Sequence, residues 1–184
     1  MIILGVIHLK GLPGSPSNKL NLEEITELAQ NDIDNLSKAG VNGIIVENFG
    51  DVPFVKNDVS KRTVASLTSV IQNLNIDSKL KLGVNVLRND GIAALSIAEA
   101  TNADFVRINV LNNVMMFTDQ GIIEGEANKI AQFNKSLNKN IEIYADVFVK
   151  HAVPPEGSKI ENHAEELINR AGADVVIVTG DGTG

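Results

Sequence analysis

The sequence predicts an α/β fold, a (β/α)8 barrel of which about six βα units lie within its 184 residues. Two observations predict it: short β-branched runs alternate with amphipathic stretches, and polar residues gather where the runs end. The runs are apolar throughout, which is typical of strands buried on both faces of a parallel sheet. The predicted strands cover residues 2–9, 43–48, 82–87, 105–111, 141–149 and 174–179.

Helical stretches fill the gaps between these runs. Asn21 and Glu24 have the spacing of a capping box, which predicts the start of the first helix there. Three helix ends that precede a strand carry a residue suited to a left-handed cap, namely Gly40, Asn102 and Gly172. Repeated βα units predict this recurrence, and generic αβ loops explain it equally well.

Six strands and five helices fit two architectures. One is an open doubly wound sheet, and the other is a TIM barrel that lacks its last quarter. The chain ends directly after a predicted strand, and a complete barrel usually takes about 250 residues. We therefore expect a TIM barrel truncated after its sixth strand, forming a single domain over residues 1–184. Its open strand edges would invite self-association, so we expect a homo-oligomer.

Composition narrows the class of protein. A net charge of -7 disfavours nucleic-acid binding, and the lack of cysteine excludes disulfides and zinc-thiolate sites. The N-terminus lacks the basic stretch of a signal peptide. No apolar run approaches the ~20 residues that cross a bilayer. We expect a cytoplasmic protein without a transmembrane segment or a nucleic-acid partner.

Polar residues at the carboxyl ends of the strands predict the site, because parallel α/β folds build their sites there. The strand starts, in contrast, are apolar. The candidate residues are His8, Glu47, Asn48, Asn85, Arg88, Arg107, Asn109, Asp119, Asp146, Lys150, His151, Thr179 and Gly180.

Spacing groups some of these candidates. Side chains two residues apart share a face of a strand, so Arg107 and Asn109 point the same way, as do Asp146 and Lys150 if their strand stays regular. A buried charge must pair or face a wet cavity. Arg107 with Asp146 also fits a structural ion pair, and His8 fits a hydrogen-bonded core histidine.

Residues 112–120 form a longer connection after the fourth strand. Its Met115, Met116 and Phe117 fit a lid, a contact with a protein partner, or packing on a neighbouring loop. No G-x-G-x-x-G, P-loop or H-E-x-x-H motif occurs. Carboxylates and His8 could ligate a metal, but no spacing demands one, so we name no metal ligands and leave the cofactor open.

The strand-end motifs together resemble the BtpA family along the whole chain. Gly11 stands where the family is expected to have proline, a departure that affects only the rigidity of one loop. The matching stretches are GVIHL at 5–9, LPGSP at 12–16, GIIVENFGDVPF at 43–54, LGVNVLRND at 82–90, RINVL at 107–111, TDQGIIEG at 118–125, ADVFVKHA at 145–152, VTG at 178–180 and TG at 183–184.

The resemblance implies a phosphosugar-type TIM barrel whose family members continue through two more βα units. It also implies two unlike functions. The first is an enzyme for a small, phosphorylated sugar- or nucleoside-like ligand, with Arg88 and Arg107 holding its anionic group. The second is a non-catalytic factor for photosystem I biogenesis that binds a protein partner, for which the family is named.

The enzyme hypothesis assigns four catalytic residues. Glu47 or Asp146 would be the general base, and His8 or Lys150 would supply the acid or an electrostatic clamp. Lys150 could instead form a Schiff base with a carbonyl substrate. Glu47 and Lys150 are the hardest of the four to explain structurally, because each sits at a strand end that both layers should cover.

Overall fold

Six parallel strands form the main sheet, in the order β1-β2-β3-β4-β7-β9. The computed structural model describes residues 1–112, 114–117 and 120–180. The strands lie at the six predicted positions, each shorter than predicted. They span Leu4–His8 (β1), Gly43–Glu47 (β2), Lys81–Asn85 (β3), Phe105–Ile108 (β4), Glu142–Asp146 (β7) and Val175–Ile177 (β9).

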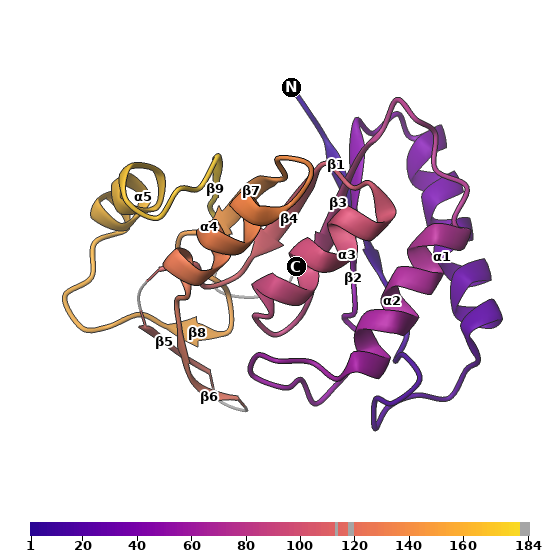
Figure 1. Cartoon of the computed structure of the whole chain (residues 1–184), viewed down its shortest axis with the longest axis horizontal. Coiled ribbons are helices and arrows are strands. Elements are labelled where there is room, and N and C mark those ends of the chain that lie inside the picture. The colour runs from indigo at the N-terminus through magenta and orange to yellow at the C-terminus, as the bar shows by residue number, and fades with distance from the viewer. Residues whose placement is uncertain (113, 118–119, 181–184) are drawn as a thin grey trace.

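Within the described residues, five helices follow strands along the chain, and consecutive ones from α1 to α4 pack against each other beside the sheet (Figure 1). The strand order follows the chain without a reversal. A doubly wound sheet needs such a reversal, so that alternative does not describe this fold. The helices span Leu22–Lys38 (α1), Lys61–Asn73 (α2), Gly91–Thr101 (α3), Ala127–Ser136 (α4) and Ile160–Asn169 (α5).

The local signals at the helix ends are confirmed. The Asn21 side chain accepts a hydrogen bond from Glu24 N at 3.0 Å, and Glu24 Oε2 accepts one from Asn21 N at 2.8 Å. Gly40, Asn102 and Gly172 have positive φ angles of 80°, 57° and 79°. Each therefore adopts the left-handed conformation that ends a helix before the next strand.

The hydrophobic core lies between the helices and one face of the main sheet. Ile7, Val46, Val84 and Val106 are fully buried on that face. Side chains alternate between the faces of a strand, so the residues between them point to the opposite face, where the polar side chains gather. No helix within the described ranges is both long enough and apolar enough to cross a bilayer.

A second, antiparallel sheet of three short strands takes in part of the connection over residues 112–120, where no strand was predicted. β5 (Val114–Phe117) pairs with β6 (Gly121–Glu124) as a hairpin, and β8 (Ala152–Val153) pairs with the other edge of β5. Figure 1 shows this small sheet at the lower left, apart from the main sheet. Ile123 of β6 is buried with Val110 and Val149, so the hairpin packs on the segments that follow β4 and β7.

Candidate functional site

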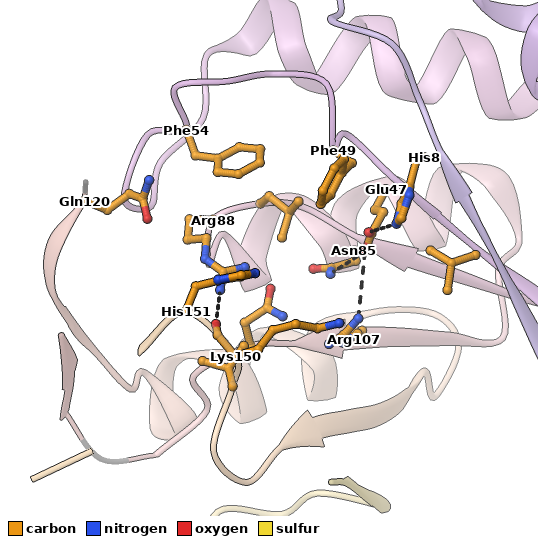
Figure 2. Close-up of a pocket in the computed structure, with 14 residues that line it drawn as sticks. His8, Glu47, Phe49, Phe54, Asn85, Arg88, Arg107, Gln120, Lys150 and His151 are labelled. Carbon is orange, nitrogen blue, oxygen red and sulfur yellow. Dashed lines mark hydrogen bonds and ion pairs between the residues drawn. The ribbon is translucent and has the colours of Figure 1, made fainter. Parts of the chain in front are cut away.

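Four polar side chains form one row across four neighbouring strands. His8 pairs in register with Glu47, Glu47 with Asn85, and Asn85 with Arg107. Register partners point to the same face of a parallel sheet, so the row lies on the face opposite the helical core. All four side chains line a cavity of about 530 Å³ at the carboxyl ends of the strands (Figure 2).

Glu47 is the centre of this row. Its side chain is 5% exposed, and Oε1 lies 2.8 Å from His8 Nε2. Oε2 accepts a hydrogen bond from Asn85 Nδ2 at 3.0 Å and lies 3.9 Å from an Arg107 nitrogen. A buried carboxylate is costly unless it is paired and hydrogen-bonded. Both oxygens of Glu47 therefore have partners, and one of these partners is an imidazole that faces the cavity.

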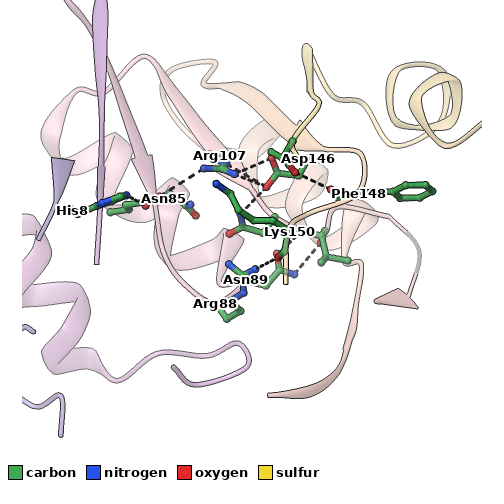
Figure 3. A network of polar contacts seen from close by, with 12 residues as sticks. His8, Asn85, Arg88, Asn89, Arg107, Asp146, Phe148 and Lys150 are labelled. Carbon is green, nitrogen blue, oxygen red and sulfur yellow. Dashed lines mark hydrogen bonds and ion pairs between the residues drawn. The ribbon is translucent and has the colours of Figure 1, made fainter. Parts of the chain in front are cut away.

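Arg107 joins Glu47 to a second buried carboxylate, Asp146. The guanidinium donates to both Asp146 oxygens at 3.0 to 3.3 Å, and Asn109 Nδ2 donates to Oδ2 at 2.8 Å (Figure 3). Burial raises the pKa of the Asp146 carboxyl, and the Arg107 charge opposes that rise. Asp146 is 3% exposed and does not line the cavity. Its contacts hold Arg107 and Asn109 in place.

Asn109 presents an acceptor without a partner. Its Nδ2 is committed to Asp146, which fixes the orientation of the amide, and no hydrogen bond reaches Oδ1 among the described residues. The residue is 2% exposed and lines the cavity. An unsatisfied buried acceptor costs about 1–3 kcal/mol. A donor on a bound ligand or on water would satisfy this oxygen.

Two basic residues reach the cavity from beyond the strands. Arg88 is 8% exposed and donates to the Lys150 carbonyl oxygen at 3.0 Å. β7 ends at Asp146, so Lys150 does not share a regular strand face with it; Lys150 lies in the turn that follows. Its side chain lines the cavity and makes no ion pair or hydrogen bond with the rest of the described chain. His151 is exposed at the same rim.

Aromatic residues of the connection after β2 form the opposite wall. The Phe49 ring stacks on His8 with centroids 4.2 Å apart, and the Phe54 ring meets Phe49 edge-on at 6.4 Å. Both line the cavity, as does Gln120, whose Nε2 is buried without a partner among the described residues. Sequence reasoning missed these three as site residues. The signal for Phe49 was its place directly after the polar strand end Glu47-Asn48, whereas Phe54 lies further along the same connection.

Asn48 and Asn89 act as clamps between neighbouring strand ends. Asn48 accepts from Leu87 N at 2.7 Å and donates to Leu87 O at 3.3 Å. Asn89 accepts from Val110 N at 2.8 Å and donates to Val110 O at 2.9 Å. Each amide thus satisfies the backbone of one residue just beyond the next strand. Neither side chain lines the cavity, so the predicted ligand residue Asn48 here shapes the wall.

Asp51 supports the Asn48 clamp from behind. It accepts from Asn48 Nδ2 at 3.0 Å and from Leu12 N at 2.7 Å. Burial raises the pKa of the Asp51 carboxyl, and these donors oppose the rise. The contact with Leu12 ties the connection after β1 to the connection after β2, which carries Phe49 and Phe54 of the cavity wall.

The remaining predicted residues lie elsewhere. Thr179 donates to the Phe148 carbonyl oxygen at 3.0 Å, and neither Thr179 nor Gly180 lines the cavity. Asp119 lies outside the described residues. Within the described ranges, no three His, Asp or Glu side chains are grouped so as to hold a metal ion.

Comparison with known proteins finds relatives that match nearly the whole chain. An uncharacterised protein of Pyrococcus horikoshii is 47% identical over 99% of this chain and 69% of its own length. One of Thermococcus kodakarensis is 48% identical over 99% of this chain and 68% of its own length. A Synechocystis protein named "Photosystem I biogenesis protein BtpA" is 41% identical over 99% of this chain and 63% of its own length. The profile of the BtpA family matches residues 1–184, and the chain belongs to that family.

Proposed function

We propose that this chain is an enzyme that acts on a small, phosphorylated sugar- or nucleoside-like metabolite by acid–base chemistry. The observation that carries the proposal is the His8–Glu47 pair, in which a buried carboxylate lies 2.8 Å from an imidazole that is 46% exposed. A carboxylate oriented on an imidazole is an arrangement used for general acid–base catalysis. A purely structural pair gains little from leaving one partner exposed at the mouth of a cavity.

The proposed architecture is a (β/α)8 TIM barrel of which six βα units lie in this chain. Its support is a strand order that follows the chain and helices that pack beside one another along the sheet. A barrel lumen would enclose the polar row on the sheet face opposite the helical core. Sites in such barrels form at the carboxyl ends of the strands, where the cavity lies.

The contacts divide the proposed roles. We assign the base to Glu47 acting with His8, because Asp146 is committed to Arg107 and Asn109 and does not line the cavity. Lys150 then serves as the clamp for an anionic substrate group, since its ammonium has no partner within the described chain. A Schiff base at Lys150 predicts a borohydride-trapped adduct with a carbonyl substrate, and its absence removes that variant of the mechanism.

A thermal-shift screen against phosphorylated sugars and nucleosides tests the proposal. A ligand at 100 times its dissociation constant adds about 2.7 kcal/mol of stability. That is several degrees for a chain of this size, at roughly 2–4 °C per kcal/mol. The ligand found in the screen should be turned over by the wild type and by Glu161→Gln, an exposed control on α5. It should not be turned over by Glu47→Gln, which lacks the proposed base. No hit in a folded protein, or full turnover by Glu47→Gln, would count against an enzyme.

A protein-binding role is the second candidate, and the name of the Synechocystis relative motivates it. One observation favours it: Ile122 and Val153, 51% and 63% exposed, pair in register with Met116 from opposite sides. Alternating side chains put Ile122 and Val153 on one face of the small sheet. Exposed apolar surface marks interaction sites. Ile122→Lys with Val153→Lys should then abolish partner binding, while Glu47→Gln should not.

Self-association is a separate proposal. β1 and β9 are the edge strands of the main sheet in the described chain, and open edges invite pairing with another chain. We propose that the protein is a homo-oligomer. Sedimentation at micromolar concentration tests this, and a single monomeric species would refute it.

A further inference from the structure

We infer, building on the proposed enzyme function, that the cavity is shaped for a nucleoside monophosphate rather than for a phosphosugar without a base. The ligand would set its base against Phe49 and Phe54, donate a ribose hydroxyl to Asn109 Oδ1, and place its phosphate at Lys150. Three different features of the cavity match these three parts.

The aromatic wall provides the first match. Phe49 is 41% exposed although it lies against the cavity, and His8 covers only one of its faces at 4.2 Å. Phe54 stands at 60° to Phe49, so the two rings form a corner. Leu87 and Val149 add apolar surface to the same cavity. Open aromatic faces are surfaces on which nucleobases stack, and a phosphosugar without a base leaves most of this wall unused.

The orphan carbonyl of Asn109 provides the second match. Its Nδ2 is held at 2.8 Å from Asp146, so the amide cannot turn to offer its donor instead. Oδ1 is therefore a fixed, buried acceptor with no partner in the described chain, on a residue that lines the cavity. A ribose hydroxyl is a donor that such an acceptor selects, because a ligand without it leaves the acceptor unpaired.

The charge of the cavity provides the third match. Among the described residues, Arg88, Arg107 and Lys150 line the cavity with three positive charges. Glu47 in the lining and Asp146 behind Arg107 contribute two negative ones, so these five side chains leave one positive charge in excess. The chain as a whole carries -7, so this excess is a local feature. Of the three, Lys150 has an ammonium without an ion pair or hydrogen bond within the described ranges. An ammonium binds phosphate as a point charge.

The positions of these features fit one ligand. Figure 2 shows Phe49 and Phe54 along one side of the cavity, with Lys150 and Arg107 along the other. The cavity of about 530 Å³ lies within the range of small-molecule sites. A base on the aromatic side and a phosphate on the basic side would leave the ribose between them.

Calorimetric titration with four probes tests the inference: adenosine monophosphate, uridine monophosphate, ribose 5-phosphate and adenosine. At least one nucleotide should bind at least about tenfold more tightly than ribose 5-phosphate, because a stacked base adds that much affinity. The nucleotide should also bind more tightly than adenosine. If 2′-deoxy and 3′-deoxy nucleotides both bind as tightly as the ribonucleotide, the role of Asn109 is refuted.

Matched variants locate the two ends of the ligand. Phe54→Leu should reduce nucleotide affinity toward that of ribose 5-phosphate and leave ribose 5-phosphate unchanged, whereas Phe133→Leu, a half-buried control on α4, should change neither. Lys150→Gln should weaken binding of the three phosphorylated probes and leave that of adenosine unchanged. Equal affinity for ribose 5-phosphate and both nucleotides overturns the inference but leaves the proposed enzyme intact. If none of the four probes binds but another phosphosugar is turned over, the nucleotide inference alone is overturned. If no ligand binds or is turned over, both the inference and the proposed enzyme function are overturned.

Discussion

His8 Nε2 lies 2.8 Å from Glu47 Oε1, and the two side chains differ about ninefold in exposure, at 46% and 5%. The exposed partner stands where a substrate would meet it, and its removal takes a donor from the buried Glu47 carboxylate. We predict that His8→Ala lowers stability by about 1–3 kcal/mol and reduces turnover about 10²–10⁴-fold. Urea unfolding and steady-state kinetics on the substrate from the screen check this. Lys10→Ala, exposed just beyond the same strand, should keep full turnover.

The Arg107–Asp146 pair makes the opposite prediction, because it is buried. Asp146→Asn leaves the guanidinium short of a charged partner and should destabilise the protein by about 3–5 kcal/mol. Replacing both residues by apolar ones of similar size, in Arg107→Met with Asp146→Leu, should cost less than the single change, since the two paired charges are then removed together. A double-mutant cycle from urea unfolding measures the coupling between the two side chains. Additive effects would show that the pair is not coupled.

Most of the main sheet could be predicted from the sequence, because a strand that is covered on both faces has a continuous run of apolar residues. Glu47 and Arg107 could be named as site candidates from their place at the ends of such runs. The register between the strands that carry these two residues could not be predicted, because it depends on how neighbouring strands pair. β8 is the sharpest failure: Ala152–Val153 is a strand only because it pairs with Phe117 and Met116 of a segment far away in the chain.

The site also has parts that only the folded chain reveals. The unpaired oxygen of Asn109 follows from the contact of its amide with Asp146, which the sequence does not state. The position of Phe54 against the cavity depends on the path of an irregular connection. Asn48 was predicted to bind a ligand because it is a polar residue at a strand end. In the folded chain its amide instead hydrogen-bonds the backbone of Leu87.

The Asn48 clamp predicts a structural rather than a binding defect. Asn48→Asp keeps an acceptor for Leu87 N but removes the donor to Leu87 O and brings a carboxylate beside Asp51. We expect a loss of about 1–3 kcal/mol in stability, typical of a buried polar group left unpaired. Binding of any ligand found in the screen should persist below the midpoint of thermal unfolding. Asn162→Asp, exposed on α5, is the matched control and should be neutral.

Gly83 predicts a packing defect with a specific rescue. A Cβ at this position would lie 2.3 Å from the Phe105 ring, which is fully buried on the neighbouring strand. Gly83→Ala should therefore cost about 1–3 kcal/mol by overpacking. Adding Phe105→Leu should recover part of that loss, because the smaller side chain frees the space. Gly180→Ala, with nothing within 4 Å of the added carbon, should be neutral in the same thermal-unfolding measurement.

The Lys81–Glu142 pair predicts a small stability term with a defined pH window. The two groups lie 2.9 Å apart and are 45% and 42% exposed. The hydrogen bond with Lys81 lowers the pKa of Glu142 from 4.5, and the one with Glu142 raises the pKa of Lys81 from 10.5. The Glu142 carboxylate therefore adds stability above pH 4.5, and this contribution is lost as the pH falls through the lowered pKa of Glu142. The ammonium adds stability below pH 10.5, lost as the pH rises through its raised value.

Solvent screening keeps the contribution of that pair below about 1 kcal/mol. Lys81→Met should accordingly reduce the free energy of unfolding slightly at pH 7, and by less at pH 3 or in 1 M salt, which screens exposed charges. Lys135→Met, an exposed change on α4, provides the baseline for removing one positive charge. Urea unfolding at the two pH values gives the comparison. If the loss of stability is equal at pH 3 and pH 7, then Lys81 stabilises the sheet through the packing of its methylene groups and not through its charge.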